Sequence, residues 1–188
     1  LGRIEAQICR DCYTATQVLE KFKTFWLNHN IQAIPPHLMS KLGMLQDGVI
    51  VKSETSQLGK VHDTFLKMMP NAKKVMGTSP IFHPDYVRLF KDVLNSGGKI
   101  DLIVTEEVFN KTFETAITLG EGELFQKFML DGHLTIYLID EVKIALTVTD
   151  NFVSMGLFNL NGQYDYSTDL LATDSTALMW GEEVFAHY

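Results

Sequence analysis

The clearest hydrophobic pattern in the chain lies at residues 143–159, KIALTVTDNFVSMGLFN. In its first half every second residue is aliphatic, a period of two that predicts a β-strand. Its second half, from Phe152 to Phe158, is almost entirely apolar, which is typical of a strand buried on both faces. Asp150 and Asn151 lie between the two halves and indicate a tight turn. We therefore expect a central β-hairpin that the rest of the chain covers on both sides.

The beginning of the chain has the period of a helix instead. Small and apolar side chains recur there at spacings of three and four, at Ile4, Ile8, Cys12, Ala15, Leu19, Phe22 and Trp26. This heptad-like seam predicts one helix over residues 2–28, about 40 Å long at a rise of about 1.5 Å per residue. Such a helix either pairs with a copy of itself or packs against its own domain. The seam favours pairing in a dimer, and intrachain packing remains the alternative.

Strand and helix patterns alternate through the rest of the chain. Strands are predicted at residues 49–52, 74–79, 99–105, 134–139, 143–149, 152–158 and 169–173. Helices are predicted at residues 36–45, 56–69, 84–96, 106–118, 123–130 and 174–188. The strand–helix–strand run over residues 74–105 predicts a βαβ unit with a parallel pair. The predicted fold class is α/β, with a mixed sheet of about seven strands flanked by helices and preceded by the long N-terminal helix.

Composition places the chain among ordinary globular proteins. Apolar residues make up 46% and charged residues 21% of its 188 residues. No apolar run approaches the roughly 20 residues that a membrane-spanning helix needs, and no secretory signal is visible. Two cysteines cannot build a disulfide framework, which favours a reduced, intracellular setting. We therefore expect a cytoplasmic protein that does not associate with membranes.

Charge argues against nucleic-acid binding through this part of the protein. The formal net charge is -7, and the 16 Lys and Arg residues are scattered rather than clustered. Only Lys73 and Lys74 are adjacent. Because the chain begins at Leu1 rather than Met, we expect further residues before it, and these could carry a DNA-binding segment.

Three places in the sequence carry candidate chemistry. Cys9 and Cys12 have the spacing of half a zinc site or of a redox pair, but no second ligand pair follows at a fitting spacing, which favours two reduced cysteines on a helix. His83 follows a strand and precedes a helix, where it would contact a ligand or simply cap and pack. Glu106 and Glu107 suit the first turn of a helix, with acid–base work or cation binding as the alternative.

The central hairpin resembles the motif of phospholipase D-like domains, in which His-x-Lys and four further residues precede an Asp. Asp150 falls on the motif Asp, and residues 156–159 fall on the small-residue and Asn segment that follows. Lys143 stands at the position of the motif His, and Ala145 at that of the motif Lys. The nucleophile and the residue that holds the anion are therefore both replaced. The resemblance implies this family's sheet without its chemistry, and we expect no enzyme.

Longer segments resemble the C-terminal domain of archaeal winged-helix transcriptional regulators of the methanogenesis-regulator type. They are SPIFHPDY at 79–86, KIDLIVTEEVF at 99–109, KIALTVTDNFVSMGLF at 143–158 and YDYSTDLLATDSTALMWGEEVFAHY at 164–188. The resemblance implies that residues 1–30 form a linker and dimerisation helix and residues 31–188 an α/β effector-binding domain. It also implies a DNA-binding winged helix before Leu1. Leu1-Gly2-Arg3 resemble the residues that follow the wing in such regulators.

We thus predict the effector-sensing and dimerisation region of a transcriptional regulator, with an unknown small molecule as effector and no cofactor, metal or catalytic residue. Placement at strand ends and inward polarity select the candidate pocket lining: Ser79, Phe82, His83, Thr105, Glu106, Tyr137, Thr147 and Thr149. For Thr147 and Thr149 the alternative is a solvated strand face. Two other functions stay open. One is a ligand-free oligomerisation module, and the other is a divergent phosphodiester hydrolase that uses His83, Lys143 and Asp150.

Overall fold

The computed structural model describes residues 1–57 and 59–188 and has one mixed sheet. Within these residues seven strands lie in the order β1-β7-β6-β5-β2-β3-β4. The strands are β1 (Val49–Lys52), β2 (Lys74–Ser79), β3 (Lys99–Val104), β4 (Leu134–Leu138), β5 (Ile144–Thr149), β6 (Val153–Phe158) and β7 (Tyr164–Ala172). The α-helices are α1 (Gly2–Lys21), α2 (Lys23–Asn28), α3 (Pro36–Met39), α4 (Lys60–Met68), α5 (Asp85–Asn95), α6 (Glu106–Thr118), α7 (Gly122–Leu130) and α8 (Ser175–His187). Short turns of 3₁₀-helix are η1 (Ile31–Ala33), η2 (Leu42–Leu45) and η3 (Met69–Asn71). The predicted fold class is confirmed.

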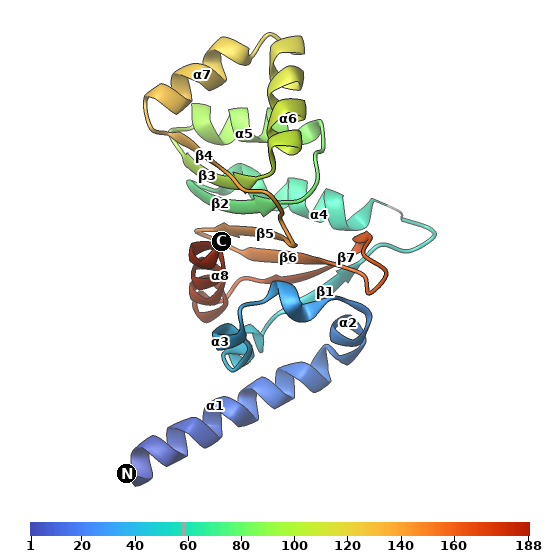
Figure 1. Ribbon diagram of the computed structural model, residues 1–188, viewed down its shortest axis with the longest axis vertical. Helices are drawn as coiled ribbons and strands as arrows, with labels where there is room; N and C mark the ends of the chain where they lie inside the picture. The colour runs from blue at the N-terminus through green and yellow to red at the C-terminus, as the bar shows by residue number, and fades with distance from the viewer. Residues whose placement is uncertain (58) are drawn as a thin grey trace.

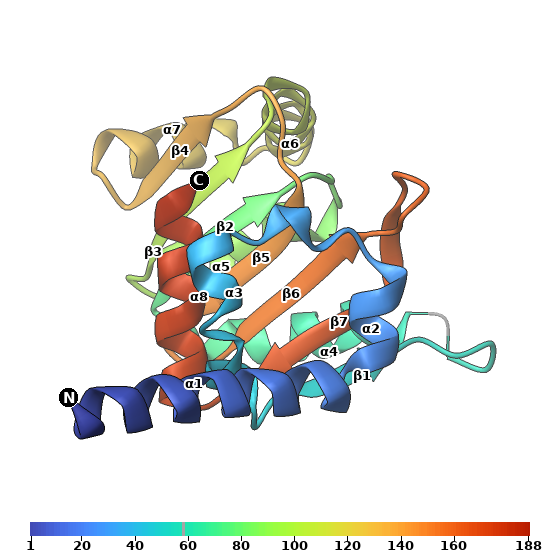
Figure 2. The ribbon, with the colours of Figure 1, turned by 60° about the horizontal axis from the view of Figure 1, so that its bottom comes forward.

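Helices cover both faces of the sheet. Figure 2 shows α8 and α3 in front of the sheet and α4 and α5 behind it, while Figure 1 shows α6 and α7 beside α5. The alternation in β5 explains this arrangement, because Ile144, Leu146 and Val148 face the core under α8. The intervening residues face the other side. Trp180 of α8 is fully buried in that first core and donates its indole N–H to the Leu38 carbonyl at 3.2 Å.

The strand directions follow the sequence patterns. β2 and β3 are parallel, as the βαβ run predicted, and β3 and β4 are parallel as well. β5 and β6 form the expected antiparallel hairpin, with Leu146 opposite Met155. The side-chain hydroxyl of Thr149 closes its turn by accepting the N–H groups of Asn151 at 3.0 Å and Phe152 at 2.9 Å.

The last strand is longer than the predicted residues 169–173, because β7 already begins at Tyr164. Phe158 of β6 lies opposite Tyr164, whereas Gly156, two positions earlier, lies opposite Asp169. β7 therefore carries extra residues that bulge out of the pairing between these two points. Bulges redirect side chains, and here the bulge places Tyr164 and Asp169 on the same face of the sheet beside Gly156.

The N-terminal helix is present but is divided in two. α1 ends at Lys21, Phe22 has φ -110° and ψ 28°, and α2 then turns toward the sheet. The turn buries Phe25 and Trp26, which a straight helix over residues 2–28 would carry past the domain. Physically, burial of these aromatic rings outweighs the loss of helical continuity.

The hydrophobic seam of this region is divided as well. In its second half Ala15, Phe22 and Trp26 are buried against the same chain, whereas Leu19 is 38% exposed. Gly43 permits this close packing, because a Cβ there would lie 2.3 Å from the Thr14 hydroxyl oxygen. In the first half, Ile4 and Ile8 are 62% and 58% exposed, and the N-terminal end of α1 stands clear of the other elements in Figures 1 and 2.

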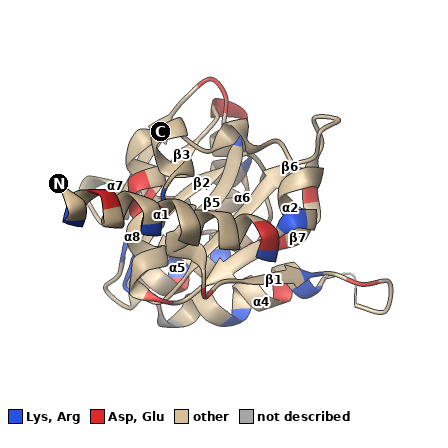
Figure 3. Ribbon diagram, turned by 90° about the horizontal axis from the view of Figure 1, so that it is seen from below, with Lys and Arg blue, Asp and Glu red and all other residues tan. Residues whose placement is uncertain are grey.

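Other differences from the predicted elements are small. The helix predicted at residues 36–45 is α3 followed by η2, and the helix predicted at residues 56–69 begins at Lys60. Leu58, which that prediction included, lies outside the described residues. None of the described helices is both long and apolar enough to cross a membrane. Basic and acidic positions are interspersed over the ribbon in Figure 3, α1 included.

Candidate ligand-binding pocket

A pocket of about 340 Å³ lies between the sheet and the helices α4, α5 and α6. Its floor comes from β2, β5, β6 and β7, at the centre of the sheet. Four floor residues have small side chains, namely Gly77, Ala145, Thr147 and Ser154. Since the surrounding helices contribute large apolar residues, this run of small ones leaves the space open. Phe65, Leu102 and Val108 form apolar walls.

One wall of the pocket carries a carboxyl group. Asp169 accepts a hydrogen bond from the Ser154 hydroxyl at its Oδ2, over 2.9 Å. Its other oxygen, Oδ1, is buried and has no hydrogen-bond partner among the described residues. Burial raises the pKa of Asp169 to about 6, because the charged form loses hydration. A buried acceptor without a donor is costly, which makes this oxygen a candidate contact for a ligand.

Gly156 explains how Asp169 and Tyr164 reach the same spot. A Cβ on Gly156 would lie 2.3 Å from the Tyr164 hydroxyl oxygen and 2.7 Å from Asp169 Oδ1. Glycine at this position thus makes room for both polar groups. Burial also raises the pKa of Tyr164 well above its usual value, so its hydroxyl keeps its proton at neutral pH.

The mouth of the pocket carries two imidazoles and a second carboxylate. His62 comes from α4, His83 from the segment just before α5, and Asp85 is the first residue of α5. His62 Nε2 lies 3.1 Å from Asp85 Oδ2, and the two imidazole rings are 4.0 Å apart between centroids. Burial and the nearby His62 lower the pKa of His83, which favours its neutral form. Beneath them burial raises the pKa of Tyr86 to about 12.

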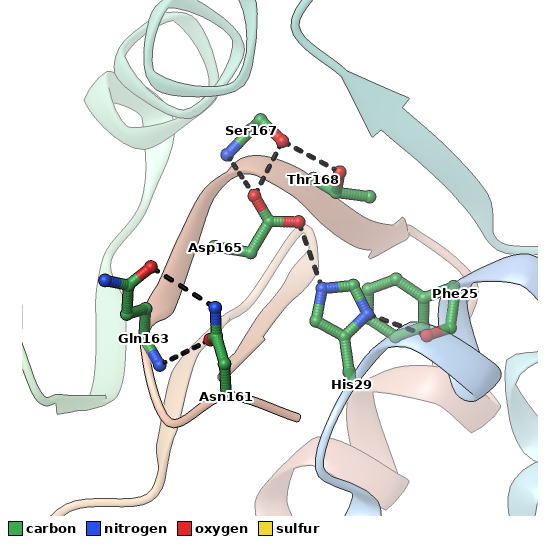
Figure 4. A network of polar contacts seen from close by, with 7 residues as sticks. All are labelled: Phe25, His29, Asn161, Gln163, Asp165, Ser167 and Thr168. Carbon is green, nitrogen blue, oxygen red and sulfur yellow. Dashed lines mark hydrogen bonds and ion pairs between the residues drawn. The ribbon is translucent and has the colours of Figure 1, made fainter. Parts of the chain in front are cut away.

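A buried polar network connects the β7 bulge to α2 (Figure 4). His29, at the end of α2, approaches the Phe25 carbonyl with Nδ1 at 2.7 Å and Asp165 Oδ2 with Nε2 at 3.0 Å. The imidazole thus lies between a backbone carbonyl of α2 and a side-chain carboxyl of the bulge. Asp165 Oδ1 accepts the Ser167 N–H at 2.8 Å and the Ser167 hydroxyl at 2.6 Å. The bulge is thereby tied to α2, the helix that follows α1.

Comparisons with known proteins assign this architecture. Residues 58–188 match the family model of the methanogenesis regulatory protein FilR1, middle domain. The chain belongs to this family. A methanogenesis regulatory protein FilR1 from Methanothrix harundinacea (strain 6Ac) is 28% identical over 190 residues, which cover 100% of this chain and 42% of that protein. The chain thus spans less than half the length of this relative.

Two solved structures are similar to this FilR1 middle-domain chain. The structure of TrmBL2, an archaeal chromatin protein, matches with a TM-score of 0.57 and 14% identity. The match covers 100% of this chain and 64% of that one and shows a shared fold. Phosphatidylserine synthase from Haemophilus influenzae Rd KW20 matches with a TM-score of 0.45 and 14% identity over 74% of this chain and 37% of that one, too weakly to support an argument. The phospholipase D-like resemblance stays a prediction.

Three of the predicted ligand-binding residues line the pocket of this FilR1 middle-domain chain: Ser79, His83 and Thr147. Ser79 already donates its hydroxyl to the Ile81 carbonyl at 2.6 Å. Thr147 faces the pocket from β5, half-buried, rather than facing bulk solvent. Whether any of them binds a ligand stays a prediction.

The other five predicted residues lie outside the described pocket lining: Phe82, Thr105, Glu106, Tyr137 and Thr149. Thr149 closes the hairpin turn, and Thr105 caps α6 by accepting the Val108 N–H at 3.4 Å. Tyr137 is 50% exposed on β4. These positions were predicted from the carboxyl ends of strands, whereas the pocket of this family member lies over the middle of the sheet.

Sequence reasoning missed the residues that give the pocket its polarity and its aromatic walls. They are His62, Phe65, Tyr86, Ser154, Tyr164 and Asp169. One signal was available, since Asp169 is an acidic residue adjoining the apolar run LLA of a predicted strand. The aromatic residues of the β7 bulge gave no such signal, because a bulge breaks the period of two.

The residues proposed for a hydrolase are not brought together. Lys143 and Asp150 flank opposite ends of β5, and only His83 of the three lines the described pocket. Although burial alone would raise the pKa of Asp150, the N–H groups of Lys73 and Lys74 donate to its Oδ1 at 2.9 Å and 3.2 Å and lower it. Asp150 therefore anchors the start of β2.

Proposed function

We propose that this FilR1 middle-domain chain is the effector-sensing region of a transcriptional regulator. A small molecule would occupy the pocket under α4, α5 and α6, and its binding would modulate DNA binding by a winged-helix segment preceding Leu1. The observation that carries the proposal is the apolar pocket of about 340 Å³, in whose wall one Asp169 oxygen has no hydrogen-bond partner among the described residues. A closed core would instead have favoured a ligand-free oligomerisation module.

The relatives support the regulatory part of the proposal. One is a methanogenesis regulatory protein, and the other is an archaeal chromatin protein whose structure is described as showing a novel mode of DNA binding. The scattered basic residues of this chain support contact with DNA through a separate segment rather than through the domain itself. We place the regulator in the cytoplasm, where such a protein meets its DNA and a metabolite.

The pocket favours a ligand with an apolar body and one hydrogen-bond donor or cationic group. Phe65, Leu102 and Val108 suit the apolar body, and Asp169 suits the donor. Tyr86 and Tyr164 add aromatic faces near the carboxyl, which further favour a cation such as an ammonium group. Binding of a cation would also favour ionisation of Asp169, which burial otherwise disfavours.

A contiguous set of contacts runs from the pocket to the N-terminal helix. Tyr164 and Tyr166 line the pocket from the β7 bulge, with their rings 4.9 Å apart and nearly perpendicular. Asp165, between them in sequence, binds His29 at the end of α2. A ligand that displaces either tyrosine would therefore act on the segment that positions α2 and α1. Signalling requires two such arrangements with different ligand affinities.

We further propose that the exposed part of α1 pairs with α1 of a second copy. Ile4 and Ile8 continue the seam whose other half is buried in the same chain. Pairing would remove these two side chains from water and place two DNA-binding segments side by side. In this arrangement residues 1–30 act as linker and dimerisation element, and residues 31–188 as the effector-binding domain.

Native mass spectrometry of the chain, released gently from its host, tests assembly and occupancy together. A dimer with a reproducible additional mass supports the sensor.

The ligand class is then tested by calorimetry with phenethylamine against phenethyl alcohol, which differ in the donor group. Tighter binding of the amine that Asp169→Asn removes, while the exposed Asp131→Asn leaves it unchanged, is the expected result. Equal affinities for both compounds, unchanged in Asp169→Asn, would refute a role for this carboxyl.

A further inference from the structure

We propose that His62, His83 and Asp85 bind one divalent transition-metal ion, of the zinc class, at the mouth of the pocket. Each of the three residues offers a ligand atom, and these atoms all lie within 4.8 Å of one another. The ligands come from two parts of the chain that are separate in sequence, α4 and the segment from His83 to the first residue of α5. A metal site assembled in this way has no contiguous sequence motif, so sequence patterns alone do not indicate it.

The distances fit a common ion. His62 Nε2 lies 3.1 Å from Asp85 Oδ2, and His83 Nδ1 lies 3.6 Å from the same oxygen. In a tetrahedral zinc site with bonds of about 2.0–2.1 Å, two ligand atoms are about 3.4 Å apart. The two separations lie on either side of this value. All three ligand atoms lie within 4.8 Å of one another, so the side chains must close in to surround one ion.

The donor set selects the kind of metal. Two imidazoles and one carboxylate suit zinc and its neighbours cobalt and nickel, whereas calcium and magnesium prefer oxygen ligands alone. His62 and Asp85 now share a hydrogen bond, and His83 Nδ1 accepts the Asp85 N–H over a long 3.2 Å. A bound ion would replace the proton that His62 and Asp85 share. It would also accept the lone pair of His83 Nδ1 in place of the Asp85 N–H.

Metal binding would fix a loosely held part of the domain. Among its described residues, Lys60 to Met68, α4 has none that is fully buried. An ion held by His62 on one side and by His83 and Asp85 on the other would join α4 to α5 across the pocket mouth. Three protein ligands leave a fourth position open, and both histidines line the pocket. Contact between this open position and the effector rests on the proposed function. Metal binding itself does not depend on that function.

The test is titration of the full chain with ZnCl₂ alone by calorimetry, and with CoCl₂ by visible absorption. We expect one ion per chain and the strong absorption bands of tetrahedral cobalt. His62→Gln and Asp85→Asn should each weaken binding by about a hundredfold, at the upper end of the loss known for supporting residues alone. The control is His37→Gln/His187→Gln, a pair of exposed histidines with ring centroids 5.9 Å apart. It should bind as the unmodified chain does.

A second background excludes the exposed thiols. Cys9→Ser/Cys12→Ser should retain the ion, because those cysteines lie on α1 rather than on α4 or α5. Loss of binding in this background, or unchanged binding in both His62→Gln and Asp85→Asn, overturns the proposal. Circular dichroism confirms folding of each variant, and His83→Gln replaces any variant that fails to fold. Because no organic ligand is present, a negative result leaves the sensor proposal standing, and failure of amine binding leaves the metal site standing.

Discussion

Asp169 has a buried carboxyl group whose ionised form destabilises the folded domain. Its carboxyl lies in the pocket wall with one oxygen bonded to Ser154 and the other unpartnered among the described residues. Burial raises its pKa from 3.8 to about 6. The folded state therefore favours the neutral acid more than the unfolded state does. Its contribution to stability is fully present below about pH 4 and is lost as the pH rises through 6.

Asp169→Asn should make the domain more stable at neutral pH. An amide accepts the Ser154 hydroxyl but cannot ionise, so the variant avoids a cost of about 3 kcal/mol, from two pKa units at about 1.4 kcal/mol each. Urea unfolding from pH 4 to pH 8 measures this gain in stability. The free energies of unfolding of variant and unmodified chain should be similar at pH 4, diverge between about pH 4 and pH 6, and differ by a constant amount above that range. Asp131→Asn, at an exposed position, should show a constant difference. A constant difference for Asp169→Asn as well would show that its pKa is not raised.

Gly156→Ala should destabilise the domain by about 1–3 kcal/mol, because the new methyl group collides with two polar side chains in a packed site. The nearer atom is the Tyr164 hydroxyl oxygen, 2.3 Å from the built Cβ. The double variant Gly156→Ala/Tyr164→Phe should recover part of the loss, since it removes that oxygen. Gly2→Ala, where nothing lies within 4 Å of the built Cβ, is the matched control for urea unfolding. No recovery in the double variant would mean that Asp169 or the backbone sets the cost.

At the scale of elements, the β7 bulge and α2 depend on one histidine. His29 is 4% exposed and joins the Phe25 carbonyl to Asp165. His29→Ala removes the imidazole that contacts Asp165 Oδ2. The half-buried Asp165 carboxyl group then lacks this hydrogen bond. We expect a loss of about 2 kcal/mol, in the range found for breaking a partly buried charged hydrogen bond. Chemical denaturation measures it, and His133→Ala, at an exposed histidine, should cost far less.

Hydrogen exchange separates the structural role of His29 from a general loss of stability. If His29 ties α2 to the bulge, amides of α2 and of residues 164–168 should lose protection together in His29→Ala, with little change in α7 on the far side of the sheet. Uniform loss of protection across the domain would instead indicate that the variant acts through global stability, and the route from pocket to α1 would lose its support.

Elements whose pattern reflects burial could be predicted from sequence. β5 alternates because each face meets a different layer, and β6 is apolar because both faces are covered, so the hairpin follows directly. The first residues of β7 could not be predicted, because Tyr164 to Thr168 follow the geometry of a bulge rather than a period. The break at Phe22 could not be predicted either, because a heptad seam has the same pattern whether it packs against a second chain or against its own domain.

The pocket was only partly predictable because it depends on tertiary neighbours. Ser79 and His83 were predicted from their place at or just after the end of a strand, and Thr147 from the inward polarity of its strand face. Ser154 and Asp169 become neighbours only through the pairing of β6 with β7, which sequence patterns do not specify. The small residues that open the cavity come from three adjacent strands. None of them is unusual in its own segment.

At the scale of the whole molecule, the exposed end of α1 predicts how two chains assemble. Ile4→Glu/Ile8→Glu should convert the proposed dimer into a monomer, because it places charges on the unburied half of the seam. The two residues make no buried contact within their own chain, so the free energy of unfolding of each monomer should change by less than about 0.5 kcal/mol. Size-exclusion chromatography with light scattering measures the mass across a range of concentrations.

The matched control adds the same charge to the same helix at polar positions. Gln7→Glu/Gln17→Glu changes two exposed residues and should leave the assembly as it was. If both double variants dissociate the dimer equally, net charge rather than the apolar seam governs assembly. If the unmodified chain is itself a monomer at every concentration, the exposed isoleucines require another occupant. The proposed coupling between pocket and DNA would then have to pass through one chain, along His29, α2 and α1, without a partner helix to align it.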